Sequence, residues 1–194
     1  MGKVMTSFLY PYLDFAAVVY VLTEDCEDGV KSFLLPKYGW ELLGVGTPEE
    51  YFSGLVENTR RLLPERLWRI ENTVTDCKNG WESILKITDE TREKLYANQL
   101  YVLSNHRKVN GAAVLLYPEL LQDLYERFSG PYFVIPSSVH EVILLKETGE
   151  EDEEYLNGMV SEVNASHVEP EEVLSGHVYY FSATKGLCKS KSEE

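Results

Sequence analysis

The stretch from Leu100 to Leu145 constrains the fold of this chain more than any other part of its sequence. Apolar runs typical of β-strands alternate there with polar turns that contain Asn, His, Ser and Glu, and one amphipathic helical pattern lies between them. The order predicts strand, turn, strand, helix, strand, turn, strand. We therefore expect an α+β fold, with a mixed, mainly antiparallel sheet and helices packed on it.

The same patterns predict the elements of the rest of the chain. Strands are expected at 15–23, 30–35, 101–104, 111–117, 132–135, 139–145 and 176–182. The first of them, at 15–23, should be buried on both faces. Helices are expected at 47–63, 118–128 and 151–163, with helical turns at 65–70 and 170–174. The third helix should bury Tyr155, Leu156, Met159, Val160 and Val163.

The length of 194 residues is usual for one domain, which we expect over residues 1–184 with a frayed tail at 185–194. Tyr20–Thr23 resembles Tyr101–Ser104, and at the same offset Phe33–Leu35 resembles Val114–Leu116. This likeness favours a duplicated hairpin-plus-helix unit, with copies at 15–63 and 100–163. The alternative is that apolar hairpins resemble one another by chance. The weakest pattern lies at 74–98, where a turn at 78–80, a strand at 81–87 and a short helix at 88–96 are predicted.

The net charge of −14, from 32 acidic and 18 basic residues, bears on the partners of the protein. A surface this negative repels phosphate backbones and anionic membranes, so we expect binding to neither nucleic acid nor membrane. The charge serves solubility or attracts a basic partner, and part of it is concentrated in a predicted solvated loop at Glu147–Glu154. The three scattered cysteines favour a reducing, cytoplasmic location, and no apolar run approaches the roughly 20 residues of a membrane helix.

The segment Ser137–Glu141 groups a hydroxyl, an imidazole and a carboxylate. Ser138, His140 and Glu141 are therefore candidates for a catalytic group of the serine–histidine–acid kind, which requires each partner within hydrogen-bond reach of the next. On an extended strand, however, Ser138 and His140 face one side and Glu141 the other. The alternative interpretation is a turn capped by serine, with a half-exposed histidine at a strand end.

The turn Asn105–Gly111 contains His106, Arg107 and Lys108, and its last two residues are typical of a tight turn. It is either a hairpin tip or a small positive loop that meets an anionic ligand. The ligand-binding candidates are Asn105, Arg107, Asn110 and Ser137. The residues His140, Glu141, His167 and His177 lack the spacing of a metal site, and no pattern in the sequence indicates a metal or another cofactor.

Several motifs carry a family resemblance, namely Tyr101–Asn105, Asn110–Pro118, Tyr132–Val142, Met159–Asn164, Val168–Ser175 and His177–Tyr179, with Pro11–Tyr20 and Gly44–Asn58 upstream. Through these motifs the chain resembles an uncharacterised bacterial family of domains of unknown function, over most of its length. The resemblance implies that longer members have a further N-terminal region and that this chain corresponds to their C-terminal part. It implies no activity and no catalytic residue.

Three hypotheses of function remain open. The first, which we favour over an enzyme, is a non-catalytic cytoplasmic module. It binds a protein or a small ligand through the loops 105–110 and 137–141. The second is a hydrolase-type enzyme that uses His140 with Ser138 or a nearby acid. The third is a homodimer that forms through an uncovered sheet edge.

Overall fold

A computed structural model describes residues 9–26, 29–35, 48–71, 83–85 and 94–193 of the chain. The chain divides into two compact units, Met1–Leu62 and Leu63–Glu194, and each unit is described by itself. One domain over residues 1–184 stays a prediction. In the part of the chain that is described, no helix combines the length and the apolar character needed to cross a membrane.

The first unit contains two antiparallel hairpins and a helix. β1 (Leu9–Tyr12) pairs with β2 (Phe15–Val18), and β3 (Tyr20–Cys26) pairs with β4 (Gly29–Leu34). The single strand predicted at 15–23 is therefore two strands. Alternate residues of β2 are exposed, so β2 is not buried on both faces as predicted. α2 (Pro48–Leu62) begins where its proline predicts, and it buries Val56.

The second unit is built on a six-stranded sheet in the order β10-β9-β7-β8-β6-β5, in which every neighbouring pair is antiparallel. The α+β fold predicted from the sequence is thereby confirmed. The six strands are β5 (Glu65–Arg69), β6 (Leu100–Asn105), β7 (Tyr132–Ser138), β8 (Glu141–Lys146), β9 (Tyr179–Ser182) and β10 (Gly186–Cys188).

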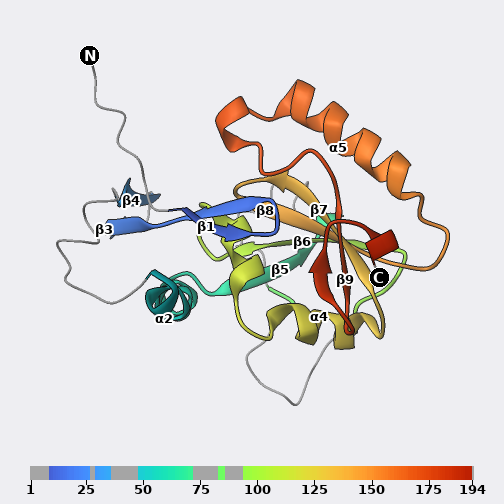
Figure 1. The fold of residues 1–194 in the computed structure, drawn as a ribbon, viewed down its shortest axis with the longest axis horizontal. Coiled ribbons are helices and arrows are strands. Elements are labelled where there is room, and N and C mark those ends of the chain that lie inside the picture. The colour runs from blue at the N-terminus through green and yellow to red at the C-terminus, as the bar shows by residue number, and fades with distance from the viewer. Residues whose placement is uncertain (1–8, 27–28, 36–47, 72–82, 86–93, 194) are drawn as a thin grey trace. The chain divides into compact units, whose positions relative to one another are not determined.

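Helix α5 (Glu153–His167) covers one face of this sheet (Figure 1). Its Leu156 and Val160 form an apolar cluster with Phe133 of β7 and Tyr180 of β9. The other three side chains that were predicted to be buried, Tyr155, Met159 and Val163, are exposed instead. The prediction failed because the sheet covers a narrower strip of the helix than the apolar spacing implies.

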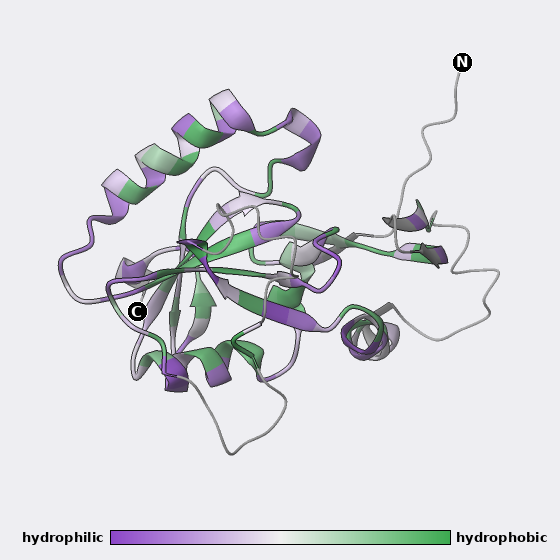
Figure 2. Cartoon of the chain, turned by 180° about the vertical axis from the view of Figure 1, so that it is seen from behind, coloured by the Kyte–Doolittle hydropathy of each residue, from purple (hydrophilic) through white to green (hydrophobic). Residues whose placement is uncertain are grey.

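Helix α4 (Leu120–Phe128) covers the opposite face (Figure 1). The ring of Phe128 lies 5.2 Å from that of Tyr132 and 5.6 Å from that of Tyr101, measured between centroids. The Tyr132 hydroxyl donates a hydrogen bond to Leu121 O at 3.0 Å, so the polar end of this buried ring is satisfied. Successive residues of β7 point to opposite faces of the sheet, and a helix covers each face. Both sets of side chains are therefore buried, and the strand is a continuous apolar run. Figure 2 shows green, apolar strands between the two helices.

Two predicted elements of this unit are wrong. The helical turn at 65–70 is the strand β5, whose Leu67 and Trp68 are buried beside β6. The strand at 111–117 is the 3-10 helix η2 (Gly111–Leu116). β6 already has β5 and β8 as neighbours, so it has no free edge for a returning strand. Every residue of 100–163 is described, and the hairpin on which the predicted duplication depended is absent from that segment.

Most other predictions for this unit are confirmed. The helices at 118–128 and 151–163 and the turn at 170–174, seen as the 3-10 helix η3 (Pro170–Glu172), agree within a few residues. β7 continues beyond its predicted end through Ser138. Of the elements predicted over 78–96, residues 78–82 and 86–93 lie outside the described residues, and 83–85 and 94–96 are neither helix nor strand.

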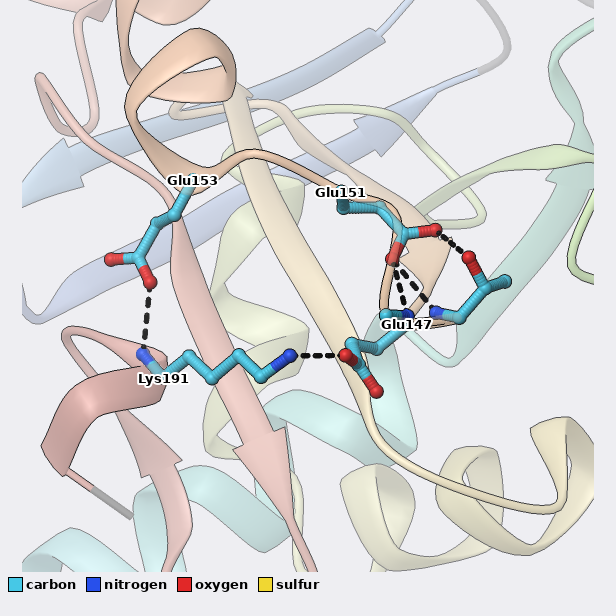
Figure 3. Close-up of polar contacts among 6 residues, drawn as sticks. Glu147, Glu151, Glu153 and Lys191 are labelled. Carbon is cyan, nitrogen blue, oxygen red and sulfur yellow. Dashed lines mark hydrogen bonds and ion pairs between the residues drawn. The ribbon is translucent and has the colours of Figure 1, made fainter.

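The tail that was predicted to fray is held in place over its described part. β10 pairs with β9 and buries Cys188, and the 3-10 helix η4 (Lys191–Glu193) follows. The Lys191 ammonium forms an ion pair with Glu147, and the Lys191 backbone N–H donates to Glu153 Oε2 at 3.1 Å (Figure 3). Two acids of the predicted solvated loop therefore bind the C-terminal segment.

The rest of that acidic loop prepares the start of α5. The Glu151 carboxylate accepts hydrogen bonds from the Thr148 N–H and hydroxyl, both at 2.7 Å, and from the Gly149 N–H at 3.1 Å (Figure 3). Burial acts to raise the pKa of Glu151, but these hydrogen bonds outweigh it and the pKa is lowered. Asp152 caps the helix by accepting from the Glu154 and Tyr155 N–H groups at 2.9 and 3.3 Å.

Candidate functional site

The segment Ser137–Glu141 is the tight hairpin turn between β7 and β8. Ser138 pairs with Glu141 in the register, which leaves Val139 and His140 as the turn, and Ser137 lies at a bulge that precedes it. Ser138 Oγ accepts a hydrogen bond from the His140 N–H at 3.1 Å. The serine-capped turn is confirmed, but His140 lies in the turn rather than on an extended strand.

The loop that follows β6 is organised by one buried side chain. Asn105 is 1% exposed, its Nδ2 donates to Val109 O at 2.8 Å and its Oδ1 accepts from the Arg107 N–H at 2.9 Å. Lys108 and Asn110 have left-handed backbones, with φ of 54° and 50°. The loop is therefore closed by Asn105, and it leads into η2 instead of returning as a strand.

The two turns meet at one end of the central strands, where β6 ends and β8 begins. The Asn110 N–H donates to His140 Nδ1 at 3.0 Å, Ser104 Oγ donates to His140 O at 2.7 Å, and the Ala112 N–H donates to Val139 O at 3.1 Å. The hydrogen bonds thus bring together two sets of residues that were proposed separately from the sequence. These are Asn105 and Asn110, proposed as ligand-binding, and Ser138 and His140, proposed as catalytic.

Gly111 permits this close approach. A Cβ at Gly111 would lie 2.0 Å from Ser104 Oγ and 2.2 Å from His140 O, far inside van der Waals contact. The dipeptide Asn110–Gly111 was interpreted from the sequence as turn chemistry. The structure adds that its glycine is required by the packing of a second turn 29 residues away in the sequence, at His140.

A third segment completes the cluster. His140 Nε2 lies 3.3 Å from Glu172 Oε1, and the Val139 N–H donates to Glu172 O at 2.8 Å. The sequence analysis did not select Glu172, because 32 residues separate it from His140 and no spacing pattern connects a turn to a distant 3-10 helix. We call Ser104, Asn110, Ser138, His140 and Glu172 the His140 cluster.

The hydrogen bonds of the His140 cluster assign the histidine tautomer. A backbone N–H can only donate, so Nδ1 accepts from Asn110, and a neutral imidazole then carries its proton on Nε2, toward Glu172. Both ring nitrogens are therefore engaged. Glu172 is a partner for the imidazole, while the contact that joins Ser138 to His140 runs to the backbone N–H and not to the ring.

The positive charges beside the cluster lie on the loop 105–110 and on β5. Lys108 Nζ lies over the Trp68 ring, 5.1 Å from its centroid. Burial lowers the pKa of Lys108, and the charge of Glu141 partly opposes this. Arg66 shares a face of β5 with Trp68, since alternate strand residues face the same side. We call the loop 105–110, which contains His106, Arg107 and Lys108, the basic loop, and Arg66 pairs with Ser104 on the strand that leads into it.

The remaining histidines have separate surroundings. His177 Nδ1 donates to Val178 O at 2.9 Å, and His167 lies in the exposed last turn of α5. Among the residues that the structure describes, no group of three or more His, Cys, Asp or Glu side chains has the arrangement to hold a metal ion.

Comparison with known proteins adds the family. The model of DUF5688, described as a family of unknown function, matches residues 6–183. No curated protein and no solved structure matches the chain. The resemblance to a family of unknown function is thus confirmed, while the bacterial source and the longer members stay predictions. The match extends over nearly the whole sequence, and this protein belongs to the DUF5688 family.

Proposed function

We propose that the protein is a non-catalytic binding module of the bacterial cytoplasm, and that its basic loop binds an anionic group. The observation that carries this proposal is the bond from the Asn110 N–H to His140 Nδ1, which anchors a positive loop to a rigid hairpin turn. Positive side chains on a preorganised loop lose little entropy when they bind a carboxylate or a phosphate. The cytoplasmic location is supported by the scattered cysteines and by the buried thiol of Cys188, which forms no disulfide with the described residues.

The geometry of His140 supports binding over catalysis. A general base must present an unoccupied ring nitrogen to the nucleophile. His140 Nδ1 already accepts from Asn110, and Nε2 faces Glu172. In this proposal the imidazole has a structural role, because it joins the hairpin turn to Asn110 and to Glu172.

The hydrolase-type enzyme remains a second proposal, which the carboxylate of Glu172 beside His140 favours. It requires the His140 ring to leave Asn110 and to turn a nitrogen toward Ser138 Oγ. Ester hydrolysis with p-nitrophenyl acetate tests it, since activity that disappears in both Ser138→Ala and His140→Ala would establish the enzyme. We expect neither variant to change the background rate.

Binding is tested by titrating the 15N-labelled full chain with sodium phosphate, with citrate and with a short oligoglutamate peptide, while amide shifts are recorded. The small anions and the peptide distinguish a small ligand from an acidic protein segment. We expect saturable shifts at residues 105–110. Arg107→Gln/Lys108→Gln should weaken the binding about tenfold or more, as expected for the loss of charge-assisted hydrogen bonds.

The matched control is Lys185→Gln/Lys189→Gln, which removes the same charge from exposed positions near the C-terminus. This variant should bind like the unaltered protein. Shifts that never saturate, or that the two double variants weaken equally, would show only a general attraction of anions to lysine and arginine, and the proposal would then fail.

A further inference from the structure

Helix α5 presents an exposed apolar stripe. Tyr155 is 67% exposed, Met159 37% and Val163 43%, and they follow one another at intervals of four residues. This spacing places them along one side of the helix, next to the strip that buries Leu156 and Val160. Figure 2 shows apolar residues recurring along the whole length of α5. Exposed apolar residues that align in this way mark an interaction surface more often than isolated ones do.

The surroundings of this stripe are acidic to an unusual degree. Residues 147–176 contain ten Asp and Glu but no Lys or Arg, so this segment carries ten of the 14 net negative charges of the chain. Some of these acids have structural roles, as the ion pair of Glu147 and the cap of Asp152 show. Glu154 and Glu162 have no such role among the described residues, and both are exposed on α5.

The two acids lie on the exposed side of the helix that carries the stripe. Glu162 follows Met159 by three residues and Tyr155 by seven, so it is beside the stripe, and Glu154 immediately precedes Tyr155 at the start of the helix. Gly158 also lies there, and a Cβ at Gly158 would meet nothing within 4 Å. Among the described residues no contact explains a glycine in the middle of α5, and its small size leaves room for a second backbone.

We propose that this face of α5 binds a Lys- and Arg-rich amphipathic helix of a partner protein. The apolar stripe fits the apolar side of such a helix, and the acids beside it complement its basic rim. A second copy of this chain fits less well, because a symmetric pair would bring Glu154 and Glu162 against their own counterparts. An anionic membrane is disfavoured for the same electrostatic reason. This surface is separate in its charge and in its elements from the basic loop.

The probe for this proposal is a synthetic amphipathic helix of Leu and Lys residues, about four helical turns or roughly 14 residues long, with Leu at helical spacing (i, i+3, i+4, i+7) and Lys at the other positions. The chain has only three methionines, Met1, Met5 and Met159, so 13C-methyl methionine labelling of the full chain reports directly on the stripe. We expect the Met159 methyl resonance, assigned by Met159→Leu, to shift on titration while those of Met1 and Met5 stay constant.

Two variants separate the apolar and the charged contributions. Tyr155→Ser should weaken the binding about tenfold, as for a central aromatic contact. Glu154→Gln/Glu162→Gln should weaken it about threefold to tenfold at low salt, and this effect should shrink as salt is added. The matched control, Glu119→Gln/Glu126→Gln, removes the same charge from exposed positions around α4 and should leave the affinity unchanged.

Three results would overturn the proposal. One is a Met159 resonance that does not respond to the peptide. Another is an equal loss of affinity in the control variant, which would mean that only the net charge attracts the peptide. The third is a dimer of the unaltered chain in light scattering that Tyr155→Ser dissociates, since the stripe would then be covered by a second copy.

Discussion

Helices α4 and α5 cover opposite faces of the same sheet (Figure 1), yet they use their apolar residues differently. α4 buries Leu120, Leu121, Leu124 and Phe128, each at most 8% exposed. α5 buries two large apolar residues, Leu156 and Val160, and leaves three exposed. The difference shows that one helix completes the core, whereas the other both completes the core and offers a surface.

The two helices also begin differently. Asp152 caps α5 with its side chain, after a loop that Glu151 closes. Glu119 precedes α4 with a φ of 64° and makes no side-chain cap. α4 is therefore held mainly by packing and α5 in larger part by its local hydrogen bonds. The predictions that follow test this contrast, from the largest expected effect to the smallest.

The largest effect is expected from truncation on the α4 side. Leu124 is completely buried, so Leu124→Ala should lower the free energy of unfolding by about 2–5 kcal/mol, through lost burial and a cavity. Met159→Ala removes a partly exposed side chain from α5 and should cost about 1 kcal/mol or less. Urea denaturation followed by circular dichroism measures both. Equal losses would contradict the contrast between the helices.

Replacing glycine by alanine should change the free energy of unfolding in opposite directions at Gly111 and at Gly158. Gly111→Ala places a Cβ against Ser104 and His140 at the start of η2, and it should cost about 1–3 kcal/mol. Gly158→Ala in α5 meets open space and should raise the free energy of unfolding by about 0.5–1 kcal/mol, because alanine favours the helix. Thermal unfolding of the two variants decides this. A stable Gly111→Ala protein with an unshifted Asn110 amide would show that the two turns do not pack as described.

The caps provide a smaller test. Asp152→Ala leaves two N–H groups of α5 without their acceptor and should cost about 1 kcal/mol. Glu119→Ala removes no cap and should leave the stability of the protein nearly unchanged. Hydrogen exchange at the first turns of the two helices measures the local effect. If Glu119→Ala accelerated exchange in α4 more than Asp152→Ala accelerates it in α5, the cap would be assigned to the wrong helix.

The smallest effect concerns pH. The pKa of Glu151 is lower in the folded protein than its ordinary value of 4.5, so its ionised form stabilises the fold above that value. This contribution is lost as the pH falls through the lowered pKa. Unfolding free energies measured from pH 7 down to pH 3 should therefore decline less steeply in Glu151→Gln than in the unaltered protein. Glu150→Gln, one residue away and exposed, is the control and should retain the full decline.

Much of the second unit could be predicted, because its local patterns agree with its tertiary structure. The helix over 118–128 and the strands around 132–145 have apolar spacings that match their burial. The segments 65–70 and 111–117 could not be predicted, because short apolar runs suit a strand and a helix equally well. Pairing decided both of them, since β6 accepts β5 and β8 as neighbours and leaves no edge for 111–117.

The candidate site was predicted in its parts but not as a whole. Turn residues identified the segments 105–110 and 137–141, and the structure bonds them to each other through Asn110 and His140. Glu172 could not be selected from the sequence, because nothing local distinguishes it from the acids around it. Its position depends on the hydrogen bond that ties its carbonyl to the hairpin turn at Val139.

The sequence by itself determined the α+β class, the main helices and strands of the second unit, the turn segments and the acidic charge, since all of these follow from local spacing and composition. Only the tertiary structure decided which apolar residues are buried and which polar residues meet. Met159 and Val160 are adjacent apolar residues that both fit the helical spacing of a buried face. The sheet covers Val160 and leaves Met159 partly in solvent. Burial depends on what lies opposite a side chain, and the opposing residues come from distant parts of the chain.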